Sequence, residues 1–280
     1  MRSGRFKRGW ELTKQSWALL RSNRELMRFP VLGMLATLLP LGLLVAPGLY
    51  LIDTENYAAG IPLLAVGLYV ATFISVYFGV ALAGAADALF QGQGEPTAAG
   101  HAAARSRLGA IAGWAGISTV LGLLLSLIES QGRGAGQLVG SLIGAAWGLI
   151  TFLAVPVIAI EGTGPFATIK RSAHLFKERW SGQITGNVAI GGVIGLFAIL
   201  PSLLLIVLGG YLWLNDPNGD DVALGAVLLA IGTIVFVLAA LVQRALRGVF
   251  GVALYRYAAD GQATAGFTAD ELESAVGVKR

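Results

Sequence analysis

Asp87 is the side chain in this sequence whose surroundings point most directly to chemistry. Gly79, Ala83 and Asp87 recur every four residues in an apolar stretch, so a helix there would present a line of small side chains leading to a carboxylate. An ionisable group in an apolar segment is costly, and it pairs with an opposite charge or serves an ion pathway. We expect a structural ion pair with a nearby arginine, and a proton or cation relay is the alternative. The candidate partners are Arg105, Arg107 and Arg244.

Glu161 is the second acidic candidate. It follows Pro156 at the end of another apolar stretch and precedes the turn sequence Gly164-Pro165. A proline inside a helix distorts it and frees a backbone carbonyl, so this region offers additional hydrogen-bond acceptors. We expect Glu161 to pair with Lys170 or Arg171, and a relay is again the alternative.

The residue patterns of common catalytic and metal sites do not occur in the sequence. It contains no cysteine, which excludes disulfides and thiolate metal sites, and its two histidines, His101 and His174, lie in polar segments. It also lacks a His-Glu-x-x-His motif, paired acids at metal-ligand spacing and a phosphate-binding loop. The sequence therefore predicts a protein that is not an enzyme and that needs no metal or cofactor.

Six long apolar runs must position these groups. Each reaches the roughly 20 residues that an α-helix needs to cross a bilayer. The mean hydropathy of +0.72 and the charged fraction of 13% would leave a soluble domain coated with apolar surface. The sequence therefore predicts an all-α integral membrane bundle of six transmembrane helices. The runs cover about residues 30–52, 61–86, 109–128, 136–160, 184–212 and 222–246.

The positive charges divide the polar segments between the two sides of the membrane. Of the 20 lysines and arginines, 19 lie in every second polar segment, and Arg133 alone lies in the others. Because Lys and Arg in short loops stay in the cytosol, both termini are predicted to be cytosolic. The charge forms a band beside the membrane rather than a groove with interleaved aromatic residues. We therefore expect anionic lipid headgroups, and not nucleic acid, as the partner.

Two cytosolic segments carry apolar residues at helical spacing, and each is predicted to be an amphipathic interfacial helix. The first stripe comprises Phe6, Trp10, Thr13, Trp17 and Leu20, and the second Phe166, Ile169, Ala173, Phe176 and Trp180. The bases expected on the opposite faces, as lipid-headgroup contacts, are Lys7, Arg8, Lys14 and Arg21 in the first helix and Lys170, Arg171 and Lys177 in the second. Arg244 and Arg247 are expected to be snorkelling anchors, with a lipid-phosphate clamp as the alternative.

The same two segments indicate an internal repeat. Residues 14–21 align with residues 170–177 at a constant offset of 156, and each segment precedes a run with an internal Leu-Pro, at 39–40 and 200–201. A shorter version lies at 95–108. The sequence predicts one membrane domain of three units, each an interfacial helix followed by a hairpin. The alternative is that any amphipathic helix before a span looks like this. The units are residues 1–90, 91–160 and 161–260, with a short cytosolic helix in 261–280.

Two further patterns concern packing and helix ends. A glycine recurs every four residues through the fourth run, at Gly132, Gly136, Gly140, Gly144 and Gly148. Such lines let helix backbones approach closely, within the monomer or between two copies. Near the C-terminus, Thr268-Ala-Asp-Glu271 has the form of a capping box flanked by Phe267 and Leu272, which predicts a helix from Ala269.

Residues 154–180, from Ala154-Val-Pro156 through Glu161-Gly-Thr-Gly164-Pro165 to Lys170-Arg171-Ser172 and Trp180, resemble the central signature of a broad set of uncharacterised bacterial polytopic membrane proteins. That set is similar to the Yip1-like proteins and to the membrane domain of some glycerophosphodiester phosphodiesterases. The resemblance implies a six-helix scaffold in a bacterial inner membrane. It implies no reaction, because the catalytic domain of those phosphodiesterases is a separate soluble barrel.

The function that the sequence favours is that of a non-enzymatic inner-membrane protein, which binds anionic lipid on the cytosolic side and scaffolds or organises the membrane. The first alternative is a transporter or lipid-translocating permease that uses Asp87 and the spans broken by proline. A further alternative is the membrane subunit of an enzyme complex. The sequence also leaves open a homo-oligomer or an unidentified membrane protein partner.

Overall fold

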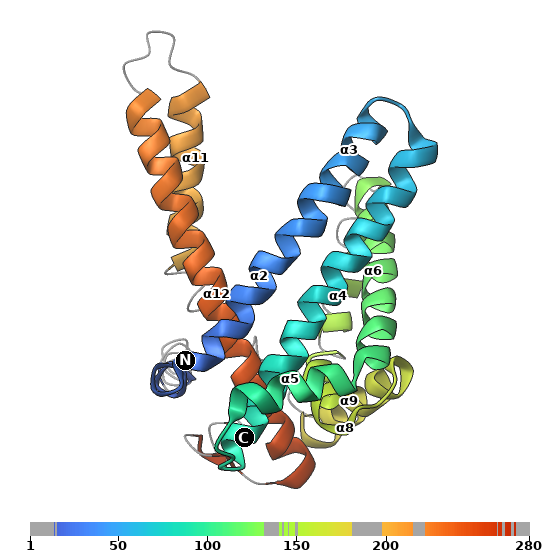
Figure 1. Ribbon diagram of the computed structural model, residues 1–280, viewed down its shortest axis with the longest axis vertical. Coiled ribbons are helices and arrows are strands. Elements are labelled where there is room, and N and C mark those ends of the chain that lie inside the picture. The colour runs from blue at the N-terminus through green and yellow to red at the C-terminus, as the bar shows by residue number, and fades with distance from the viewer. Residues whose placement is uncertain are drawn as a thin grey trace. The chain divides into compact units, whose positions relative to one another are not determined.

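The computed structural model of the protein describes residues 14, 16–131, 140–141, 143–144, 146–148, 151–180, 198–214, 222–261, 263–264, 267–269 and 272. Every regular element in these ranges is a helix (Figure 1), as the apolar runs predict. The chain divides into two compact units. One comprises Met1–Asn23, Gly182–Arg247 and Gly266–Arg280, and the other comprises Arg24–Ser181 and Gly248–Ala265.

The larger unit starts with a helical hairpin. The short helix η1 (Arg24–Met27) leads into α2 (Arg28–Pro40), the π-helical turn η2 (Leu41–Val45) and α3 (Ala46–Asp53), which together form one arm. The wider turn directly follows Pro40, where the proline ring interferes with regular α-helical bonding. The second arm is α4 (Tyr57–Phe90), which runs beside α2 and α3 in Figure 1.

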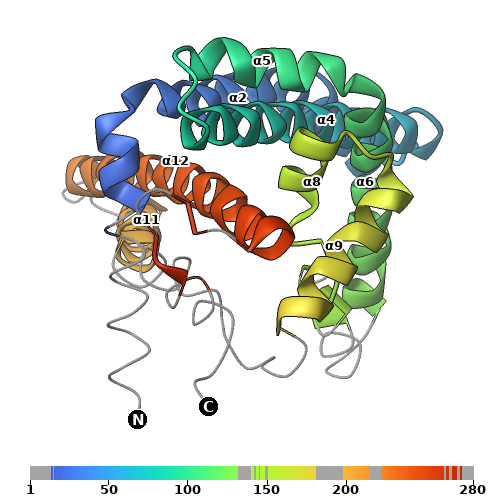
Figure 2. The ribbon, with the colours of Figure 1, turned by 90° about the horizontal axis from the view of Figure 1, so that it is seen from below.

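Further helices of the larger unit follow α4 along the chain. Helix α5 (Pro96–Ser106) packs on α4, and α6 (Leu108–Gln131) follows it. Helix α8 (Ala154–Glu161) also contacts α4, and α9 (Pro165–Trp180) contacts both α8 and α6 (Figure 2). Prolines open α5 and α9, where a missing N–H is harmless and the fixed φ suits a first helical turn.

The smaller unit contains a second helical hairpin. Helix α11 (Leu200–Leu214) pairs with the first part of α12 (Val222–Asp260). From Gly248 onward, α12 belongs to the larger unit. A Cβ at Gly248 would lie 2.5 Å from Leu82, and a Cβ at Gly251 would lie 3.5 Å from Pro156, so this end of α12 packs between α4 and α8.

In both hairpins, the two helices pack together at glycines where their backbones nearly touch. In the first hairpin, a Cβ at Gly48 would lie 2.8 Å from the backbone nitrogen of Leu64, closer than real Cβ atoms come. In the second hairpin, a Cβ at Gly225 would lie 2.9 Å from the carbonyl of Gly209. Glycine is required here because any side chain would push the helices apart. The seam glycines are Gly48, Gly60 and Gly67 in the first hairpin and Gly209, Gly225 and Gly232 in the second.

The glycine line predicted in the fourth run makes no such approach where it can be seen. A Cβ at Gly144 would make ordinary contact with Leu125 at 3.9 Å, and one at Gly148 would meet no described atom within 4 Å. Gly140 is buried, and Gly132 and Gly136 lie outside the described residues. Tight helix contacts in the described structure occur instead in the first and last hairpins, between α4 and α5, between α4 and α12 at Gly248, and between α6 and α9 at Gly113.

Within the residues that the structure describes, four helices are long and apolar enough to cross a membrane: Arg24–Asp53, Tyr57–Phe90, Leu108–Ile128 and Val222–Asp260. They match four of the six predicted spans. Their outer surfaces expose large apolar side chains such as Leu43 and Leu238, which hydrocarbon rather than water would cover. Much of the predicted spans 136–160 and 184–212 lies outside the described residues. The described end of the latter forms α11, an apolar helix of 15 residues.

Near the C-terminus, the described residues agree with a helix that starts at Ala269, while Glu271 of the predicted capping box lies outside them. Ala269 is helical, and the N–H of Leu272 donates to the carbonyl of Thr268 at 3.1 Å. Phe267 and Leu272 are both buried, as expected of the two apolar residues that flank a capping box.

Candidate functional site

Asp87 is held at the end of α4 by bonds to both of its oxygens. Arg256 Nε donates to Oδ1 at 2.7 Å, and Gln91 Nε2 donates to Oδ2 at 2.6 Å. The Asp87 side chain is only 12% exposed, so an unpaired charge here would be expensive. Arg256 also contacts Asp260, one helical turn further along α12, at 3.4 Å. The ion pair between Asp87 and Arg256 holds α4 to the end of α12.

The partner of Asp87 is not one that the sequence analysis named. Arg105 is exposed on α5, and Arg107 lies elsewhere, with its guanidinium packed against Gly162. Gly162 has φ of +67° and ends α8, so a Cβ there would be strained and would also collide with Arg107. The positive charge of Arg107 thus lies at the negative end of the α8 dipole.

Glu161, the last residue of α8, accepts two hydrogen bonds at a single oxygen. Arg171 Nε and the hydroxyl of Tyr255 both donate to Oε1, each at 2.8 Å. The pairing with Arg171 was one of the two that the sequence predicted. The hydrogen bond to Glu161 raises the pKa of Arg171, so the Arg171 guanidinium stays charged. The same bond fixes the orientation of the guanidinium. Glu161 therefore joins α8, α9 and the end of α12.

Buried hydroxyls fix the orientation of α9. Ser172 is fully buried, and its Oγ accepts a hydrogen bond from the backbone N–H of Leu153 at 3.3 Å. Leu153 ends a turn before α8 in which the chain leaves the helical path. Thr168 is also fully buried, and its hydroxyl lies 2.8 Å from that of Thr163. These bonds set which side of α9 faces the protein.

The buried side of α9 differs from the predicted one. The predicted apolar face comprised Phe166, Ile169, Ala173, Phe176 and Trp180. Of these, Phe176 is buried and Phe166 is 78% exposed, and the Trp180 side chain lies outside the described part of the structure. Thr168, Ser172 and Leu175 form the inner face instead. Hydrogen bonds to Leu153 and Thr163 allow Ser172 and Thr168 to be buried there.

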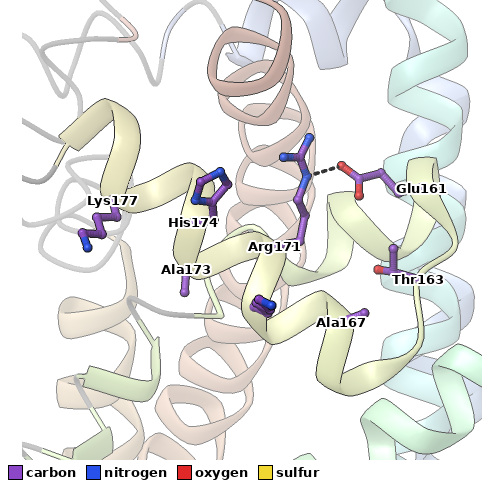
Figure 3. Close-up of a pocket in the computed structure, with 8 residues that line it drawn as sticks. Glu161, Thr163, Ala167, Arg171, Ala173, His174 and Lys177 are labelled. Atoms are coloured by element: carbon purple, nitrogen blue, oxygen red, sulfur yellow. Dashed lines mark hydrogen bonds and ion pairs between the residues drawn. The ribbon is translucent and has the colours of Figure 1, made fainter.

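A groove of about 530 Å³ runs along the outer side of α9 (Figure 3). Ala167 and Ala173 are short and leave the hollow between longer side chains, and Glu161 and Thr163 line one end. In Figure 3, Arg171 turns its Nε toward Glu161, and His174 and Lys177 follow along the helix. The basic residues that line the groove are Lys170, Arg171 and Lys177, with His174 beside them.

The groove carries a net positive charge. Among the described residues that line it, Glu161 alone is acidic and is already paired with Arg171, while Lys170 and Lys177 are exposed. His174 lies 3.3 Å from Glu178. Phe166 precedes Lys170 by four residues and therefore shares its side of the helix. A surface of this kind can attract an anion while an aromatic ring contacts apolar material beside it.

The other predicted lipid contacts lie outside this groove. Lys14 and Arg21 are exposed in the helical segment near the N-terminus, and Arg244 and Arg247 are exposed on α12. Lys7 and Arg8 lie outside the described residues. Within the part of the chain that the structure describes, no three His, Cys, Asp or Glu side chains are grouped to hold a metal ion.

Two residues of the polar clusters, Arg256 and Tyr255, were missed at the sequence level. Arg256 is 169 positions from Asp87, so sequence spacing could not pair them. The available signal was a lone base between Tyr255 and Tyr257, beyond the end of the sixth predicted span. An unpaired charge in such an apolar stretch requires a partner from another helix.

The long apolar helices and their exposed apolar surfaces define this chain as an α-helical membrane protein. A model of the family of unknown function DUF6159 matches residues 58–267, which is more than half of the chain. The protein therefore belongs to this family. A search of curated proteins gave no match.

Proposed function

We propose that this protein spans a bacterial inner membrane six times, with both termini in the cytosol, and that it binds anionic lipid headgroups there and organises the surrounding membrane. It catalyses no reaction in this proposal. The observation that carries the proposal is the exposed side of α9, where Lys170, His174 and Lys177 line a groove beside Phe166.

The construction of α9 supports an interfacial position. Its inner side is attached to Leu153, before α8, through Ser172, and Thr168 bonds Thr163 in the loop that precedes α9. The helix therefore cannot turn its bases inward without breaking the buried Ser172 hydrogen bond. Its outer side combines bases with an exposed ring, the pairing found in helices that lie at the headgroup level. Anionic headgroups attract each base near the membrane surface by about 1 kcal/mol.

The geometry of Asp87 argues against the transporter alternative. A proton or cation relay needs a carboxylate that can exchange its partner, whereas both Asp87 oxygens accept hydrogen bonds from the protein. Glu161 is likewise held by Arg171 and Tyr255. We therefore assign both carboxylates to holding helices together, and we assign lipid contact to α9.

Three repeated units, each an interfacial helix followed by a hairpin, are part of the proposal. Each seam contact of the first hairpin has a counterpart in the last one: Gly67 lies against Leu44 and Val45, and Gly232 lies against Leu205 and Ile206. The left-handed glycines Gly92, Gly162 and Gly261 follow α4, α8 and α12, where the three units would end. The proposal also retains the similarity to Yip1-like proteins and to the membrane domain of glycerophosphodiester phosphodiesterases that residues 154–180 imply.

The test is lipid selectivity of the full-length protein. Purified protein in a neutral detergent receives equal amounts of phosphatidylglycerol and phosphatidylcholine, and native mass spectrometry counts the lipids retained on it. We expect phosphatidylglycerol to be enriched, and Lys170→Gln with Lys177→Gln to reduce the enrichment. Equal retention of both lipids by the parent protein would contradict the proposed function.

A further inference from the structure

The groove on α9 differs from a general basic surface because small side chains form its floor. Ala167 precedes Lys170, and Ala173 lies between Lys170 and Lys177 along the helix; the groove that they help to line measures about 530 Å³, a volume within the range of roughly 300–1,000 Å³ typical of small-molecule sites. A helix that only needed to attract a charged membrane surface would not need a hollow. Longer side chains at these positions would also serve electrostatic attraction.

The donors around the hollow are arranged for a group with several acceptor oxygens. Lys170 and Lys177 are two helical turns apart on one side, with His174 between them. Arg171 is fixed through its Nε by Glu161, and the Tyr255 hydroxyl bonds the same carboxylate oxygen. Glu161 is thereby neutralised, so it repels an anion less than a free carboxylate would.

We propose that this groove is a discrete site for the phosphate group of an anionic membrane lipid, with Lys170 and Lys177 as the charged contacts and His174 as a further donor. This assignment rests on the proposed function and deepens it. The exposed ring of Phe166, one turn before Lys170, then contacts the apolar part of the same lipid or of its neighbour. Ammonium groups and phosphate oxygens form charge-assisted hydrogen bonds.

The test separates the hollow from the charge. Ala173→Trp and Ala167→Trp fill the groove and keep every charge, whereas Lys170→Gln with Lys177→Gln removes two charges and leaves the hollow. Ala102→Trp, at an exposed alanine of α5, is the matched control. Binding of phosphatidylglycerol to each full-length variant in neutral detergent is titrated by native mass spectrometry, and size-exclusion chromatography checks that each variant is folded.

We expect the lysine variant to lose roughly 30-fold in affinity at low salt. Each groove-filling variant should lose about tenfold, as expected for a change on the order of 1.4 kcal/mol. Ala102→Trp should bind like the parent. If the lysine variant weakens binding but both groove-filling variants bind like the parent, the discrete site is overturned and the proposed lipid binding stands. If the parent does not prefer phosphatidylglycerol over phosphatidylcholine, the proposed function fails as well.

A competition arm identifies the source of the phosphate. Soluble glycerol 3-phosphate is added to the complex of the parent protein with phosphatidylglycerol. We expect millimolar concentrations to displace little lipid, because the apolar contact beside Phe166 adds to the affinity of the lipid. Displacement at concentrations equal to that of the lipid would overturn the assignment to a membrane lipid.

Discussion

The helical segments that precede the first and the last hairpin bury matching positions but expose different side chains. In the first segment Ser16 and Leu20 are buried, and in α9 the aligned residues Ser172 and Phe176 are buried. Exposed bases also align, Lys14 and Arg21 with Lys170 and Lys177. At the position between these bases, however, the first segment has Trp17, which is 46% exposed, and α9 has Ala173.

This difference indicates how one helix design could serve two tasks. A tryptophan between two bases occupies the space that forms the groove in α9, and its amphipathic ring suits the membrane interface. An alanine at the same position leaves a hollow. Side-chain size at a single aligned position therefore separates an anchoring surface from a candidate binding site, while the buried face stays the same.

The two hairpins likewise share a packing pattern but differ in one region. Their glycine seams correspond contact by contact, but the C-terminal ends of their second helices differ: Asp87 of α4 forms an ion pair, while the corresponding residue of α12 is the buried Val252. The first hairpin is therefore attached to its neighbours by charge, and α12 supplies the opposite charge from Arg256, one turn beyond Val252.

The largest effect is expected where the two hairpins differ. Asp87→Asn should destabilise the protein by about 3 kcal/mol, because Arg256 loses its counter-charge in a site where little water reaches it. Asp260→Asn is the control: Asp260 contacts the same arginine, but its side chain is 46% exposed, so the cost should stay below about 0.5 kcal/mol. Thermal unfolding in mild detergent measures both. Equal stability of the two variants would mean that the ion pair does not hold α4 to α12.

The next effect tests what the hairpins share. Gly209→Ala should cost about 2 kcal/mol, because the new methyl group collides with the backbone of α12. The neighbouring substitution Gly210→Ala should be tolerated, since its Cβ would be 3.9 Å from Leu229. Gly48→Ala and Gly42→Ala form the corresponding pair in the first hairpin. Thermal unfolding measures all four variants. A large loss of stability on substitution in only one hairpin would show that the two glycine seams are not equivalent.

The smallest effect concerns the two aligned serines. Ser172→Ala should cost about 1–2 kcal/mol, because the N–H of Leu153 loses its acceptor inside the protein. Ser16→Ala should change the stability by less than about 0.5 kcal/mol, since the Ser16 hydroxyl has no hydrogen-bond partner in the described structure. The same unfolding assay applies to both. A larger loss for Ser16→Ala would show that the two helices are attached differently from what we describe.

Much of the fold was predictable because hydropathy and charge act over whole segments. Four of the predicted spans are apolar helices in the structure, and Glu161 pairs with a base only ten residues away. The partner of Asp87 and the inner face of α9 were not predictable in this way. Both depend on contacts that sequence spacing does not encode: Arg256 arrives from a distant helix, and Ser172 is buried through a bond to the backbone of Leu153.

The glycine seams could have been found from the sequence. The pattern Gly-x-x-Leu-Leu-Ala-x-Gly occurs at 60–67 and again at 225–232, and Leu-Pro is followed by Gly-x-Tyr-Leu at 48–51 and 209–212. The regular spacing of glycines in the fourth run predicted close packing there and not at these motifs. A glycine motif that recurs together with the large residues around it is the better sign of close packing. A glycine lets two helices approach closely only where the facing helix has a complementary surface.

The proposed lipid binding depends most directly on α9 facing the cytosolic leaflet. The accessibility of α9 to a labelling reagent can be measured. Because the chain has no cysteine, single-cysteine variants of the full-length protein can be labelled without altering it further. In intact cells that let an impermeant maleimide reach the outer face of the inner membrane, Asn56→Cys, in the loop between α3 and α4, should react. Gln93→Cys and His174→Cys should react only after the membrane is opened. Labelling of His174→Cys in intact cells would place α9 on the opposite side, away from the lipid surface that the bases are proposed to bind.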